Sequence, residues 1–153
     1  MHGIDSIDRL ILGHLQSNGR QPTSDIAELV GLSPSACHRR VKALEAAGVI
    51  DGYVAVLNPT LINRSLDVFV EISLASQSVE TLTAFERAVF TCPEVMSCHL
   101  MAGDADYLMH LAVADPKDFE RIHTQHLSRL PHVARLKSNF AIRTVVETTL
   151  HEL

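Results

Sequence analysis

Two acidic side chains, Asp104 and Asp106, stand close together beside Gly103 in the segment MAGDADYLMHL. A pair of carboxyl groups could act as a catalytic acid and base, bind a metal ion, or line a pocket for an ammonium group. Gly-Asp and Ala-Asp are also common in solvated hairpin turns. The residues of this loop therefore leave four interpretations open.

A second cluster is basic. His38, Arg39, Arg40 and Lys42 stand in GLSPSACHRRVKALEAAGVI with no acidic residue among them. On a helix, Ser35, His38, Arg39 and Lys42 share the arc opposite an apolar one. The DNA major groove admits one α-helix, and an arginine there can pair bidentately with a guanine edge. The alternative is an ordinary solvated helix face with Glu45 as a local partner, and the short helix and glycine turn before it favour DNA.

Arg40 lies beside the predicted buried arc, so its guanidinium could either reach a DNA phosphate or brace the helix pair through a carbonyl or carboxylate group. Ser33 and Ser35 fall near the helix N-terminus, where backbone N–H groups favour a phosphate. The candidate DNA contacts are Ser33, Ser35, His38, Arg39, Arg40 and Lys42.

The histidines raise a third chemistry. His123 and His126 lie about one helical turn apart, and His99 and His110 stand on strand-like runs, so converging imidazoles could bind zinc. No HExxH motif or nearby Cys pair supports this interpretation, and we predict no metal and no cofactor. The sequence also lacks GxSxG, P-loop, GxGxxG and Cys-His signatures, so we expect no enzyme.

The composition is that of a globular protein, with 46% hydrophobic and 20% charged residues among 153. The apolar runs are short and charge-broken, and the first residues lack the pattern of a signal peptide, so we expect a cytoplasmic protein with no membrane partner. The three cysteines show no CxxC spacing, which argues against a disulfide framework.

The net charge of -5 is unevenly distributed. Residues 1–50 carry five basic and five acidic side chains, so the rest of the chain carries the whole negative excess. A neutral module with a focused basic patch can bind nucleic acid while an acidic module repels it. Overall acidity therefore does not exclude DNA as a partner.

Helical periodicity dominates residues 1–50. Asp5 is placed to cap a first helix that Gly19 ends, Thr23 to cap a short second helix that Gly31 ends, and Ser33 to cap a third. The third helix would bury one arc, formed by Cys37, Val41 and Leu44. Two helices joined by a tight glycine turn form a helix-turn-helix.

The periodicity changes after residue 50, and GVIDGYVAVLNP alternates like a strand, which predicts a strand linker over residues 51–65. LDVFVEISL, VMSCHLM, YLMHLAV and RLKSNFAIRTVVE are typical of strands, and two helical stretches intervene, one halted by Pro93 and one running from Asp115 to Pro131. This order predicts a ferredoxin-like α+β sandwich over residues 66–153. Two helices cover one face of the sheet, so we expect a second copy on the other face.

The segment GRQPTSDIAELVGLSPSACHRRVKALEAAGVIDGYVAVLNP resembles the DNA-binding region of the Lrp/AsnC family, also called feast/famine regulators. The similarity continues through LDVFVEISL, GDADYLMHL and LSRLPHVARLKSNFAIRTVVETT, and so covers nearly the whole chain. It implies an N-terminal, winged-helix-like helix-turn-helix domain over residues 1–50 that binds double-stranded DNA. It also implies a C-terminal ferredoxin-like βαββαβ domain that dimerises, assembles into rings such as an octamer, and often senses an amino acid.

The resemblance also implies that the acidic loop belongs to an effector site at an interface between dimers. Asp104 and Asp106 would bind the effector's ammonium group, and Gly103 would let its carboxylate approach backbone N–H groups. The neighbours expected to complete this pocket are Leu100, Met101, Tyr107, Ser138 and Thr144. The apolar lining and the similarity to the leucine-responsive branch favour leucine or another nonpolar amino acid.

The leading hypothesis is therefore a sequence-specific transcriptional regulator that responds to a small amino acid. The alternative is a small ferredoxin-like enzyme or a standalone ligand-binding protein with Asp104 and Asp106 as its acid-base pair, because this scaffold hosts many functions. The basic arc discriminates between the two, since such an enzyme has no need of it.

Overall fold

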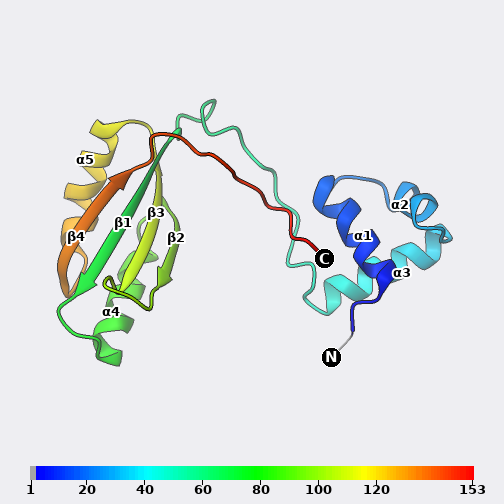
Figure 1. Ribbon diagram of the computed structural model, residues 1–153, viewed down its shortest axis with the longest axis horizontal. Coiled ribbons are helices and arrows are strands. Elements are labelled where there is room, and N and C mark those ends of the chain that lie inside the picture. The colour runs from blue at the N-terminus through cyan, green and yellow to red at the C-terminus, as the bar shows by residue number, and fades with distance from the viewer. Residues whose placement is uncertain (1–2) are drawn as a thin grey trace. The chain divides into compact units, whose positions relative to one another are not determined.

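The computed structural model describes residues 3–153, which form two compact units (Figure 1). One unit contains the chain up to Val56 together with Val146–Leu153, and the other contains Leu57–Val145. The division differs from the predicted domains at its C-terminal end, because residues 146–153 group with the helical unit and not with the sheet.

The helical unit contains α1 (Ser6–Ser17), α2 (Thr23–Leu29) and α3 (Pro34–Ala46). A capping box starts α1: the Asp5 carboxylate accepts from the Asp8 backbone N–H at 2.8 Å, and the Asp8 carboxylate accepts from the Asp5 N–H at 3.2 Å. Asn18 caps the end of α1, one residue before the predicted Gly19.

The turn between α2 and α3 is the predicted one. Gly31 has a φ of +72°, the left-handed conformation that glycine adopts without a steric penalty. The Ser33 hydroxyl accepts from the Ala36 backbone N–H at 3.3 Å, and Pro34 is the first residue of α3. The predicted cap at Thr23 is wrong: Pro22 occupies the N-cap position without a side-chain hydrogen bond, and Thr23 is already helical.

One apolar cluster holds the three helices together. It includes the predicted inward arc of α3 and consists of Ile11, Leu12, Ile26, Ala27, Cys37, Val41 and Leu44. All seven are buried. Because the apolar arc of α3 is buried in this core, its opposite arc is exposed to solvent or to a ligand.

The sheet unit has the order β1 (Leu66–Leu74), α4 (Val79–Val89), β2 (Val95–Leu100), β3 (Tyr107–Val113), α5 (Pro116–Gln125) and β4 (Val133–Phe140). The strand order is β2-β3-β1-β4, and all three pairs are antiparallel. This is the predicted ferredoxin-like sandwich. The central strand β1 pairs Val70 with Met109 on one side and with Ser138 on the other.

Alternating side chains divide the sheet into a covered and an open face. Both helices pack on the same face of the sheet (Figure 1), over Val68, Val70 and Ile72 of β1, which are fully buried. Phe85 of α4 packs against the Tyr107 ring, with 4.5 Å between ring centroids and the two rings tilted by 38°. On the other face Phe69 remains 38% exposed, in line with the expectation that two helices cover only one side.

Three predicted boundaries are wrong. Residues 51–65 contain no strand, because an extended segment needs a neighbour to pair with and this one has none within the described part of the chain. β4 ends at Phe140 and not near residue 147. The second helix of the sheet unit, predicted to run to Pro131, ends at Gln125. A short 3₁₀ turn at Leu127–Arg129 follows it and still buries Leu127.

Within residues 3–153, no helix is long and apolar enough to cross a membrane.

Phe85→Ala should destabilise the sheet unit by about 3–5 kcal/mol, because it leaves a cavity in a fully buried site against Tyr107. Urea unfolding followed by circular dichroism measures the change. Phe90→Ala is the matched control, since Phe90 lies at the end of the same helix and is 91% exposed. Equal destabilisation by the two variants would contradict the assigned core.

Candidate functional site

The third helix presents the predicted polar arc. Ser35, His38, Arg39 and Lys42 are exposed, while Cys37 behind them is fully buried. Within the described chain, neither His38 nor Arg39 has an acidic partner within salt-bridge distance. Their donors therefore remain available to an external acceptor.

Arg40 takes the bracing role. Its Nη1 atom donates to Asp5 Oδ2 at 2.7 Å and to Asp8 Oδ1 at 2.8 Å, so one guanidinium nitrogen joins α3 to both carboxylates of the α1 capping box. The N–H of Asp8 and, after it, the Arg40 guanidinium lower the pKa of Asp5 from its ordinary value of 3.8. The bracing interpretation of Arg40 thus accounts for its position, and the phosphate contact is not needed to explain it.

Lys42 also has a partner on its own helix. Its Nζ lies 2.6 Å from Glu45 Oε2, and the Tyr53 hydroxyl donates to Glu45 Oε1 at 3.2 Å. The hydrogen bond from Lys42 is the main cause of a lowered Glu45 pKa. The Tyr53 ring lies against Gly19, where an added Cβ would meet Tyr53 Cδ1 at 3.4 Å. The first residues after α3 are therefore part of the helical unit.

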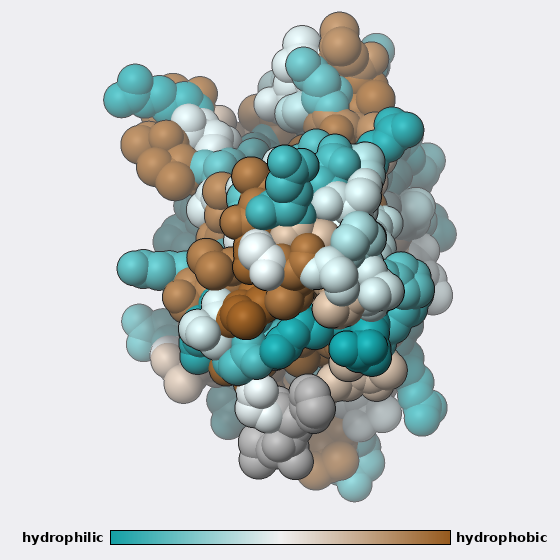
Figure 2. Space-filling model, turned by 90° about the vertical axis from the view of Figure 1, so that its right-hand side faces the viewer, coloured by the Kyte–Doolittle hydropathy of each residue, from teal (hydrophilic) through white to brown (hydrophobic). Residues whose placement is uncertain are grey.

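The face on which α2 and α3 lie in Figure 1 is turned toward the viewer in Figure 2. Hydrophilic side chains there surround a hydrophobic area. The helical unit exposes the leucines Leu10 and Leu29, at 55% and 61%.

The loop between β2 and β3 holds the acidic pair, and its two carboxylates differ. Asp106 Oδ2 accepts from the Leu74 backbone N–H at 2.7 Å, and Asp106 Oδ1 accepts from the Gln77 side-chain amide at 2.6 Å. Its backbone N–H donates to the Ile72 carbonyl at 2.9 Å. Asp106 therefore fastens the end of β1 to the loop.

Asp104 is exposed and has no hydrogen-bond partner among residues 3–153, so its carboxylate is free to accept from a ligand. An added Cβ on the neighbouring Gly103 would meet no atom within 4 Å. Within one chain nothing requires glycine there, and Gly103 leaves the backbone open to an incoming group. Met101, which starts the loop, is 43% exposed.

Tyr107 belongs to the core more than to the loop. Only 2% of it is exposed, and its hydroxyl donates to Glu86 Oε1 at 2.8 Å. Burial, reinforced by this hydrogen bond, raises the Tyr107 pKa far above its ordinary value of 10.0. The hydroxyl is thus fixed as a donor at physiological pH.

Ser138 and Thr144 do not gather at the loop within one chain. Ser138 pairs with Val70, so its side chain lies on the helix-covered face, with β1 between it and β3. Thr144 lies beyond the end of β4, and its hydroxyl is 3.4 Å from Asp67 Oδ2, at the opposite end of β1 from Asp106. The prediction placed Thr144 on an overlong last strand, and the early end of β4 explains the error.

A cavity of about 400 Å³ lies beside this loop, between α4 and β2. Leu100 and Tyr107 line it, and so does Glu86, among apolar neighbours that include Phe90 and Met96. Burial raises the pKa of Cys98, another lining residue, to about 11. Sequence reasoning missed Glu86, because an acidic residue on the outer side of an amphipathic helix has the same pattern as an ordinary solvated one.

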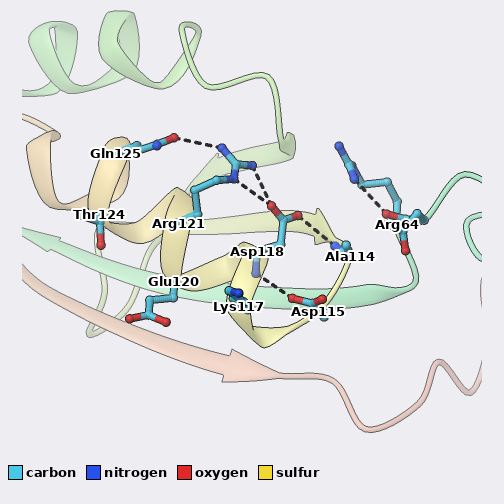
Figure 3. Close-up of a pocket in the computed structure, with 10 residues that line it drawn as sticks. Arg64, Ala114, Asp115, Lys117, Asp118, Glu120, Arg121, Thr124 and Gln125 are labelled. Carbon is cyan, nitrogen blue, oxygen red and sulfur yellow. Dashed lines mark hydrogen bonds and ion pairs between the residues drawn. The ribbon is translucent and has the colours of Figure 1, made fainter.

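A larger hollow of about 680 Å³ lies over α5 and the segment before β1 (Figure 3). Arg121 reaches Asp118 at 2.8 Å, Glu94 at 3.0 Å and Gln125 at 3.0 Å, and Asp118 also accepts from the Ala114 N–H. These charges largely satisfy one another. Arg121 and Asp118 are therefore held by neighbours within the chain.

Two of the histidines named as possible zinc ligands have other neighbours in the structure. His110 bonds to Asp67 at 2.8 Å and stacks on Phe69, on the open face of the sheet. His123 packs near Phe119 on α5. No group of three or more potential metal ligands comes together in the described chain.

The chain was compared with known proteins. Residues 67–150 match the Lrp/AsnC ligand binding domain, and residues 4–51 match a winged helix-turn-helix DNA-binding domain. The chain is 40% identical over 145 residues to a leucine-responsive regulatory protein of Haemophilus influenzae, covering 95% of this chain and 87% of that protein. The chain belongs to the Lrp/AsnC family of transcriptional regulators.

Two solved structures share this fold. An AsnC family transcriptional regulator from Agrobacterium tumefaciens is 35% identical, with a TM-score of 0.92 and coverage of 97% of this chain and 96% of that one. A transcriptional regulator from Neisseria meningitidis in complex with L-Met is 34% identical, with a TM-score of 0.90 and coverage of 96% and 95%.

Arg40→Met should destabilise the helical unit near neutral pH, because it leaves the carboxylates of Asp5 and Asp8 without their shared cation. The lowered pKa of Asp5 adds stability above pH 3.8 that is lost as the pH falls through the folded-state pKa. The deficit of the variant should therefore shrink below that pH. Thermal unfolding across a pH series measures it, and Arg39→Met, which has no such partners, should show no deficit.

Proposed function

We propose that the chain binds double-stranded DNA in the cytoplasm through the exposed arc of α3, with Arg39 and His38 as its base-reading side chains. The observation that carries this proposal is the contrast on one helix: Arg40 and Lys42 are held by carboxylates, while Arg39 and His38 have no acidic partner within the described residues. An unpaired arginine on the exposed side of a recognition helix is suited to the guanine edge.

The remaining residues of the arc support this contact. Ser33 and Ser35 lie at the start of α3, with their hydroxyl oxygens 3.2 Å apart, where backbone N–H groups favour a phosphate. Lys42 could contact a phosphate only by breaking its ion pair with Glu45, which lowers its net contribution to DNA binding. Arg40 would act indirectly, since by joining α3 to α1 it fixes the angle at which the arc meets a groove.

We further propose that DNA binding responds to an amino acid at the β2–β3 loop, with Asp104 as the acceptor for its ammonium group. Asp104 is the free carboxylate of the pair, whereas Asp106 is occupied in holding the loop. Leu100, Met101 and the adjoining cavity offer apolar surface, which favours leucine or another nonpolar amino acid. The L-Met complex of the Neisseria meningitidis relative supports this class of effector.

The assembly we propose is a homodimer formed through the open face of the sheet, with larger rings such as an octamer built from dimers. Phe69 is partly exposed on this face, beside the ion pair of Lys137 and Glu71 at 3.1 Å. Pairing of this face with a second copy would remove the Phe69 ring from water, and isologous pairing of this kind is the commonest way in which homodimers form. Paired helical units would then meet two half-sites on DNA.

Arg39→Ala should weaken specific DNA binding by roughly 1 to 3 kcal/mol if Arg39 reads a base. Binding to DNA upstream of the protein's own gene, measured by fluorescence anisotropy over a salt series, tests this, with scrambled DNA as the reference. Arg87→Ala on α4 of the sheet unit is the matched control and should bind like the wild type. An Arg39→Ala variant with unchanged specificity would remove Arg39 from the base-reading set.

Asp104→Asn should abolish the response of DNA binding to the amino acid and leave affinity in its absence nearly unchanged. The change keeps the size of the side chain and removes the charge that attracts an ammonium group. Anisotropy titrations with each of the twenty amino acids measure the response, and Glu120→Gln on α5 is the charge-matched control. A response preserved in Asp104→Asn would place the ammonium acceptor elsewhere.

A further inference from the structure

The last eight residues, VETTLHEL, contact the first helix of the helical unit. The Gln16 side-chain amide on α1 makes two hydrogen bonds to one residue of this segment. Gln16 Nε2 donates to the His151 carbonyl at 3.1 Å, and Gln16 Oε1 accepts from the His151 backbone N–H at 2.6 Å. Figure 1 shows the C-terminal end beside α1. The amide thus bonds to both the N–H and the carbonyl of a single residue, as a residue of a neighbouring β-strand would.

Two further observations support a contact of this segment with the helical unit. The Leu150 N–H donates to the Thr148 hydroxyl at 3.0 Å, which forms a local turn just before His151. The exposed fraction also falls along the segment: Val145 and Val146 are each 80% exposed, whereas Leu150 and Leu153 are 51% and 46% exposed. The leucines on either side of His151 are therefore partly covered in the place where the amide bonds form.

We propose that Val146–Leu153 is a strap that docks on α1 of the DNA-binding unit, with Gln16 as its clamp. The occupant of this surface is the chain's own C-terminal segment. The strap continues from β4, which pairs with the central strand β1. The chain thus returns to the helical unit after β4, and this return contact is noncovalent and so can be released.

The role of Gln16 depends on its having both a donor and an acceptor. Gln16→Ala removes both hydrogen bonds, and Gln16→Glu keeps an acceptor for the His151 N–H but places a second acceptor against the His151 carbonyl. His151→Pro removes the N–H from the other side of the pair. Ser17→Ala is the matched control, because the Ser17 hydroxyl donates only within α1, to the Gly13 carbonyl at 3.0 Å.

The test uses the full chain and two measurements: hydrogen exchange of the C-terminal segment by mass spectrometry, and the rate at which carboxypeptidase removes the final residues. In the wild type and in Ser17→Ala, exchange should be slower than in the free octapeptide VETTLHEL. Gln16→Ala, Gln16→Glu and His151→Pro should each speed digestion by about fivefold or more, since each removes at least one net hydrogen bond along with the order that depends on it.

The double variant Gln16→Ala with His151→Pro should digest no faster than either single variant, because both changes remove the same interaction. A wild-type segment that exchanges at the rate of the free octapeptide would overturn the proposal. Protection that persists unchanged in Gln16→Ala would overturn the role of Gln16. Circular dichroism of each variant at the wild-type value would show that the helices themselves are intact.

Discussion

The hydrogen bonds from Arg40 to the capping box of α1 fix the position of α3 against α1 within the helical unit. A capping box already satisfies two backbone N–H groups with two carboxylates, and these carboxylates would repel one another without a cation between them. Arg40 supplies that cation from α3. One arginine therefore neutralises the capping box that starts α1 and joins α1 to α3, while its neighbour Arg39 keeps a free guanidinium. The division of labour between adjacent arginines follows from which side of the helix each one faces.

Much of this fold could be predicted because its signals are local and periodic. Alternation in β1 placed Val68, Val70 and Ile72 on one face, and the structure buries all three. The caps at Asp5 and Ser33 could be predicted because a short polar side chain just before a helical apolar pattern is placed to accept from the first free N–H groups of the helix. What failed was the assignment of ends. Residues 51–65 alternate as a strand does, but a strand is defined by its neighbour, which no single segment can reveal.

The candidate site was predictable in type and not in detail. The acidic loop is recognisable in the sequence, but nothing there distinguishes Asp104 from Asp106. Only the fold shows that the Asp106 carboxylate accepts hydrogen bonds from Leu74 and Gln77, which lie in another part of the chain. Nor could periodicity show that Tyr107 is turned inward toward Glu86, or that Ser138 lies on the covered face. Such roles depend on long-range pairing, and spacing along the chain carries no information about them.

The contact of Tyr53 with Glu45 and Gly19 has a consequence for how the two units can evolve. Because that contact joins the residues just after α3 to the helical unit, the chain that is free to change in length begins only after Tyr53. Insertions or deletions before it would disturb the packing of the Tyr53 side chain. The segment around Val54 and Val56 is exposed, so it could be lengthened at the modest entropic cost of a longer loop. Differences in chain length between relatives are therefore expected after this tyrosine and not before it.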